Sequence, residues 1–156
     1  MSGFDDLRDL YQEVILQHGR HPRHAMRLDV FDATAKGDNP MCGDRVQVWV
    51  SLAEDGSIAK TGFEARGCAI SVASADLMAE TVQGRGRDDT RALFAAFREM
   101  VRTGVCPACD SALTEPMERL APLSGVHDYP SRVKCATLPW HALIAALDGT
   151  KEASSE

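Results

Sequence analysis

Thiols and one carboxylate are the side chains of this 156-residue chain best suited to metal or sulfur chemistry. Cys42 lies two residues before Asp44 in a turn-rich stretch, and Cys68 and Cys135 lie farther along the chain. The chain has five cysteines, an odd number, and cysteines outside disulfides commonly serve as metal ligands or nucleophiles. Zinc accepts both sulfur and oxygen ligands, so these four residues have the donor types for one tetrahedral site.

Two predicted strands explain how distant residues would meet. Residues 46–52 alternate apolar and polar side chains, which is typical of a strand with one wet face, and a second strand follows a turn at 58–65. Antiparallel pairing sets the start of the first strand beside the end of the second, so Cys42 and Asp44 are expected to approach Cys68. By spacing alone, three scattered cysteines without a shared role remain the commoner arrangement.

The spacing of apolar side chains predicts helices over most of the remaining chain. They cover residues 4–18, 68–82, 88–102 and 117–123, and a last helix begins near Cys135 and runs through Leu147. Pro139 is compatible with the last helix only within its first turn. Cys68 and Cys135 would then lie near helix N-termini, where the backbone dipole favours a thiolate.

The chain is predicted to fold as one domain over residues 1–148, followed by a disordered polar tail at 149–156. Its length supports a single hydrophobic core, and no repeat or linker divides it. The predicted fold class is α+β, with a small antiparallel sheet of about three strands covered by helices.

Charge and hydropathy argue against two classes of partner. The net charge is -6 and no run of Lys or Arg is long enough to follow nucleic-acid phosphates, so no nucleic acid is expected. No apolar stretch reaches the length of a membrane span, so no membrane partner is expected. The acidic start lacks the basic and apolar regions of a secretory signal, and we therefore expect a cytoplasmic protein.

Three segments around the cysteines resemble the SufU family, the zinc-containing relatives of the IscU cluster scaffolds. They are DNPMCGD at residues 38–44, RGCAISVAS at 66–74 and RVKCATLPW at 132–140. The resemblance runs from Leu10 to about Leu147, and the three motifs occur in the same order as in that family. It implies an IscU/SufU-like fold and a role in iron–sulfur cluster assembly.

The resemblance also implies a set of residue roles. The counterpart of Cys42 accepts persulfide sulfur from a SufS-type, pyridoxal-phosphate-dependent cysteine desulfurase, and the sulfur then passes to a downstream cluster scaffold. Zinc is held by the counterparts of Asp44, Cys68 and Cys135, with Cys42 as the nucleophile and remaining ligand, and the desulfurase lends a histidine to the metal. Such a protein is a sulfurtransferase-like accessory protein rather than a stand-alone enzyme.

Lys134 favours the SufU interpretation over the IscU one. IscU-type scaffolds carry a histidine directly before the last cysteine, whereas a protonated lysine cannot bind a metal. The long segment between Leu93 and Arg132 also resembles an extra region of SufU proteins. The alternative is a scaffold on which a [2Fe-2S] cluster, or iron, is assembled on the same four ligands, because thiolates suit both. A third hypothesis is an interaction domain that zinc merely stabilises.

Other residues with chemical potential are open to several interpretations. Cys106 and Cys109 form a C-x-x-C pair that would suit a second metal site, a redox pair or two thiols without a role. His18, His21 and His24 are spaced by three, but Gly19 and Pro22 prevent a continuous helix from aligning them. These histidines are therefore predicted to be solvated or locally hydrogen-bonded. Arg132 and Lys134 either steady the anionic site or act as ordinary surface charges.

Overall fold

The computed structural model describes residues 3–40, 43–105, 113–150 and 152–154 of the chain. Helix α1 (Gly3–Arg20) precedes the strands β1 (Ala33–Asn39), β2 (Asp44–Leu52) and β3 (Ile58–Arg66). The helices α2 (Ala69–Thr81), α3 (Arg87–Thr103) and α4 (Thr114–Leu120) come next. The 3-10 helix η1 (Ala121–Asp128), helix α5 (Pro130–Leu147) and the short strand β4 (Glu152–Ser154) complete the order. None of the described helices combines the length and apolar character that a bilayer crossing requires.

The four strands form one sheet in the order β3-β2-β1-β4. Strand β2 pairs with β1 and β3 in antiparallel fashion, and β4 runs parallel to β1. The register sets Asn39 opposite Asp44 and Arg45 opposite Arg66, so the end of β1, the start of β2 and the end of β3 share one edge. The predicted α+β class with three antiparallel strands is confirmed.

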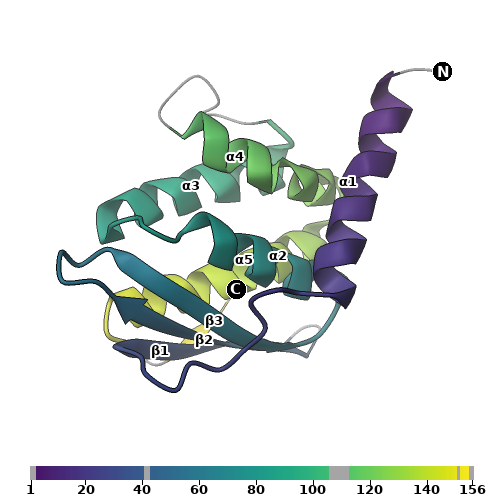
Figure 1. The fold of residues 1–156 in the computed structure, drawn as a ribbon. Helices are drawn as coiled ribbons and strands as arrows, with labels where there is room; N and C mark the ends of the chain where they lie inside the picture. The colour runs from purple at the N-terminus through teal and green to yellow at the C-terminus, as the bar shows by residue number, and fades with distance from the viewer. Residues whose placement is uncertain (1–2, 41–42, 106–112, 151, 155–156) are drawn as a thin grey trace.

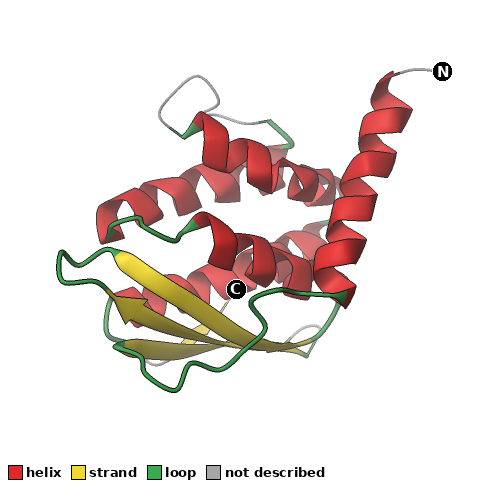
Figure 2. Ribbon diagram, viewed as in Figure 1, coloured by secondary structure: helices red, strands yellow, loops and turns green. Residues whose placement is uncertain are grey.

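The helices cover one face of the sheet in two layers (Figures 1 and 2). Helices α2 and α5 pack directly on the sheet, α3, α4 and η1 lie beyond them, and α1 stands at one end against α2. Trp140 of α5 is fully buried between these layers, with its ring centroid 4.9 Å from that of Phe97 and 5.9 Å from that of Phe94. Burial of each such ring contributes roughly 2–3 kcal/mol to folding, which stabilises the packing of α5 against α3.

The other face of the sheet is partly covered by the segment between α1 and β1. Trp49 projects from β2 to this predicted wet face, yet it is 2% exposed, and the Arg27 guanidinium lies 5.7 Å from its ring centroid. A Cβ on Gly62 of β3 would come within 2.2 Å of the Met26 carbonyl oxygen, so glycine is required where this segment crosses. The face of β2 that the alternating pattern predicts to be wet is therefore partly covered by another segment of the chain.

Neither β1 nor β4 is predicted by the sequence pattern. β1 carries small residues on its inward face, because a Cβ on Gly37 would lie 3.1 Å from side-chain atoms of both Leu138 and Val46. β4 lies within the segment predicted to be a disordered tail, and that prediction is wrong for residues 152–154. Parallel pairing of β4 with β1 uses backbone groups and does not need apolar side chains. The domain boundary at residue 148 stays a prediction.

Helix α5 begins at Pro130, five residues before its predicted start near Cys135. Proline is favourable at a first helical position because its nitrogen needs no hydrogen-bond partner there. Pro139 consequently lies in the helix interior, contrary to the prediction that it is restricted to the first turn. It has no N–H to donate to the Cys135 carbonyl four residues earlier, and the hydroxyl oxygen of Ser71 on α2 lies 3.2 Å from that carbonyl oxygen.

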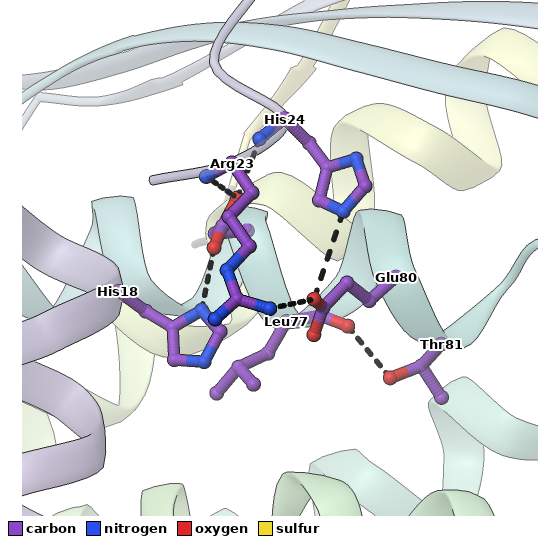
Figure 3. A network of polar contacts seen from close by, with 7 residues as sticks. His18, Arg23, His24, Leu77, Glu80 and Thr81 are labelled. Carbon is purple, nitrogen blue, oxygen red and sulfur yellow. Dashed lines mark hydrogen bonds and ion pairs between the residues drawn. The ribbon is translucent and has the colours of Figure 1, made fainter. Parts of the chain in front are cut away.

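A buried carboxylate ties the segment after α1 to α2 (Figure 3). Asp76 is fully buried, and its Oδ2 lies 2.5 Å from Nδ1 of His18. Its Oδ1 accepts hydrogen bonds of 2.8 Å from the backbone N–H groups of Arg23 and His24, whose side chains also form ion pairs of 3.8 Å with Glu80. The prediction of solvated or locally hydrogen-bonded histidines is therefore wrong for His18 and His24, because carboxylates of α2 contact both residues.

Replacing Asp76 should destabilise the fold far more than replacing Glu80. Asp76→Ala removes the shared acceptor of His18 and two backbone N–H groups, and we expect the free energy of unfolding to fall by about 3 kcal/mol. Glu80→Ala removes only long, partly exposed ion pairs and should cost less than about 1 kcal/mol. Urea unfolding of the metal-free protein measures both, and equal losses would contradict the anchoring role of Asp76.

Candidate metal centre

Three of the four predicted ligand residues meet at the shared edge of the sheet. Asp44 is the first residue of β2, Cys68 is the N-cap of α2, and Cys135 lies in the second turn of α5. One ligand atom from each lies within 4.8 Å of the others. Asp44 and Cys135 are buried, whereas Cys68 is exposed, so the cluster is open to the surface on one side. Cys42 lies outside the described residues, one peptide bond before Gly43.

The Asp44 carboxylate is held from both ends. The Cys68 backbone N–H donates to Oδ1 at 3.2 Å, and the Ser71 hydroxyl donates to Oδ2 at 2.8 Å. Sγ of Cys68 lies 3.6 Å from the same Oδ2. A Cβ on Gly67 would lie 2.1 Å from Oδ1, so the carboxylate occupies the space that any side chain at residue 67 would need. The glycine of the RGC motif therefore allows the Asp44 carboxylate to lie at this place.

Adding one methyl group at residue 67 should thus displace the carboxylate. Gly67→Ala is expected to weaken zinc binding at least about 10-fold, as loss of an oriented ligand does in other metal sites. Gly84→Ala is a suitable control, because Gly84 also has a positive φ but no atom lies within 4 Å of its Cβ position. Chelator competition measures both affinities, and a Gly67→Ala protein that binds zinc as tightly as the control would argue against this fit.

The electrostatics of the cluster favour a bound cation. Burial raises the pKa of the Cys135 thiol, and the neighbouring Asp44 and Cys68 raise it further. Two thiolates and a carboxylate this close repel one another, and a divalent cation removes that repulsion. The donor set fits zinc and also fits iron in a cluster, because both bind thiolate sulfur.

The raised pKa predicts a loss of metal-free stability at high pH. An unfolded cysteine ionises near pH 8.5. Above that pH the folded state holds a proton on Cys135 that the unfolded chain has lost, so the stabilisation is complete below about pH 8.5 and declines as the pH rises. Because one proton is involved, the free energy of unfolding falls by at most about 1.4 kcal/mol per pH unit. Urea unfolding between about pH 7.5 and 9.5 should show this decline, and Cys135→Ala should flatten it; parallel curves for the two proteins would contradict it.

Some predictions about the surroundings of the cluster need correction. Cys135 lies beyond the first turn of α5, so the prediction that the helix dipole favours its thiolate is wrong, although Cys68 does lie at a helix N-terminus.

The Arg132 guanidinium stacks over the ring of Tyr129, with its carbon 4.8 Å from the ring centroid. Cys106 and Cys109 lie outside the described residues, and their role stays open.

Ser71 is absent from the predicted site, although it touches all three ligand residues. The sequence contains a weak indication that Ser71 lies near the site. Residues three apart on a helix share a face, and Ser71 is three residues after Cys68. That indication is shared by every helical residue three places from a ligand, so only the structure distinguishes Ser71.

Comparison with known families agrees with this arrangement. Residues 10–136, which contain the whole three-residue cluster, match the family model described as the NifU-like N terminal domain. The chain belongs to this family.

Relatives within the NifU-like family carry two kinds of name. The iron–sulfur cluster assembly scaffold protein IscU of Streptococcus pyogenes serotype M1 is 36% identical over 90% of this chain and 84% of its own length. The zinc-dependent sulfurtransferase SufU of Bacillus subtilis (strain 168) is 33% identical over 92% of both chains. A crystal structure of a hypothetical protein superposes with a TM-score of 0.80 at 34% identity, covering 90% of this chain and 98% of that one.

Proposed function

We propose that this protein is a zinc-dependent sulfur acceptor in iron–sulfur cluster assembly, which takes persulfide sulfur from a SufS-type cysteine desulfurase. The main supporting observation is that ligand atoms of Asp44, Cys68 and Cys135 lie within 4.8 Å of one another at one edge of the sheet. In the sequence, Cys42 precedes Asp44 by two residues. Similarity to the sulfurtransferase of Bacillus subtilis over nearly the full length supports the same assignment.

The proposed transfer uses Cys42 as the nucleophile. Its thiolate attacks the outer sulfur of the desulfurase persulfide, a new sulfur–sulfur bond forms on Cys42, and the cysteine thiolate of the desulfurase leaves. Bound zinc would keep the thiolates of the site deprotonated near neutral pH. Asp44, Cys68 and Cys135 would hold the ion while Cys42 reacts, with Asp44 as the hardest donor of the set.

Lys134 supports the sulfur acceptor over the cluster scaffold. It directly precedes Cys135 on α5, and an ammonium group has no lone pair with which to bind iron or zinc. The protein's own ligand set is then limited to one carboxylate and three cysteines, including Cys42. A further ligand from the desulfurase would complete the shell while Cys42 reacts.

Cys42→Ala is the direct test of the acceptor. The native protein should carry about one zinc per chain and stimulate a SufS-type desulfurase, while Cys42→Ala should keep zinc on its remaining ligands and lose the stimulation. Cysteine turnover and metal analysis measure the two properties. The double variant Cys106→Ala/Cys109→Ala is measured alongside, because only a loss specific to Cys42→Ala assigns the nucleophile. Stimulation that survives in Cys42→Ala would remove the nucleophile assignment.

The scaffold alternative is favoured by the 36% identity to the IscU protein of Streptococcus pyogenes. It requires a [2Fe-2S] cluster held by Cys42, Asp44, Cys68 and Cys135, with visible absorption after anaerobic reconstitution. Transfer of that intact cluster to an apo-ferredoxin would support the alternative. A colourless zinc protein that takes up no iron and sulfide would support the sulfur acceptor.

A further inference from the structure

Ser71 contacts every residue of the described metal cluster without being a predicted ligand. It is 1% exposed on the first turn of α2. Its Oγ lies 2.8 Å from Oδ2 of Asp44, 3.2 Å from the carbonyl oxygen of Cys135 and 3.9 Å from Sγ of Cys68. A neutral hydroxyl is a poor zinc ligand beside thiolates, so its chemistry here is hydrogen bonding.

A hydroxyl has one hydrogen, so Ser71 donates to only one acceptor at a time. An ionised carboxylate is the stronger acceptor, and the distance to Asp44 is also the shorter of the two. The Cys135 carbonyl is a second acceptor within reach. Pro139 cannot donate to that carbonyl in the usual helical pattern, which leaves room for a donor from α2.

We propose that Ser71 is a positioning residue that fixes the Asp44 carboxylate for metal binding. A buried hydroxyl stranded without an acceptor is costly. The Asp44 carboxylate gives the buried Ser71 hydroxyl an acceptor at 2.8 Å, and the hydroxyl in turn holds that carboxylate in place. This inference rests on the proposed function, because it assigns Ser71 to the metal site on which that function depends.

Ser74 provides a matched control one turn farther along α2. It is also fully buried, and its hydroxyl donates to a carbonyl of α5, that of Ala136, at 2.5 Å. Its described hydrogen bond reaches no ligand side chain. Ser71→Ala and Ser74→Ala therefore remove the same group from the same helix interface, and they differ in the contact with Asp44.

The first measurement is zinc affinity by chelator competition, with thermal melting of each metal-free variant as a folding check. Ser71→Ala should weaken zinc binding about 10- to 100-fold, as loss of a hydrogen bond to a ligand does elsewhere, and Ser74→Ala should stay within about 3-fold of the native protein. Ser71→Gly also removes the hydroxyl and should repeat the loss. Equal affinities of the Ser71 and Ser74 variants would overturn the proposal.

A double-mutant cycle shows whether Ser71 acts through Asp44. In an Asp44→Ala background, Ser71→Ala should cause no further loss of affinity, and cobalt-substituted Ser71→Ala should show an absorption spectrum shifted towards that of Asp44→Ala. A full additional loss in that background would overturn the proposal, because Ser71 would then act through helix packing. A native protein that binds no zinc or cobalt would instead refute the proposed function.

Discussion

The metal cluster depends on the close approach of the Asp44 carboxylate to the backbone at residues 67 and 68. No side chain fits at Gly67, and the Cys68 N–H points at the same carboxylate oxygen that fills the space. This contact joins the first residue of β2 to the N-terminus of α2. The antiparallel register between β2 and β3 makes it possible, because it returns the chain to the edge where Asp44 lies.

The rest of the fold supplies the third ligand at that edge. α5 carries Cys135. It packs on the sheet where Leu138 lies against Gly37 of β1, and its Trp140 packs against rings of α3. Two serines of α2 lie against successive carbonyls of α5, Ser71 at that of Cys135 and Ser74 at that of Ala136. Ser71 thus offers a hydroxyl beside the one carbonyl that Pro139 cannot serve as a backbone donor.

The meeting of Asp44 and Cys68 can be predicted from the sequence because the two paired strands are neighbours along the chain. The alternation in β2 and the turn before β3 predict that Asp44 and Cys68 meet, and they do. Cys135 joins the predicted site through motif resemblance, since no local pattern relates a residue so far along the chain to the sheet edge. The predicted start of α5 is wrong because propensity penalises an interior proline, and only tertiary contacts from α2 show how Pro139 is accommodated.

X-ray absorption at the zinc edge of the zinc-loaded protein tests the shared cation most directly. Thiolate and carboxylate donors have separable distances, near 2.3 Å for sulfur and about 2.0–2.2 Å for oxygen. The account predicts a four-coordinate ion with mostly sulfur neighbours and one oxygen, and loss of sulfur scattering when Cys68 or Cys135 is replaced by alanine. A shell of nitrogen and oxygen alone, unchanged by those replacements, would show that the metal binds elsewhere.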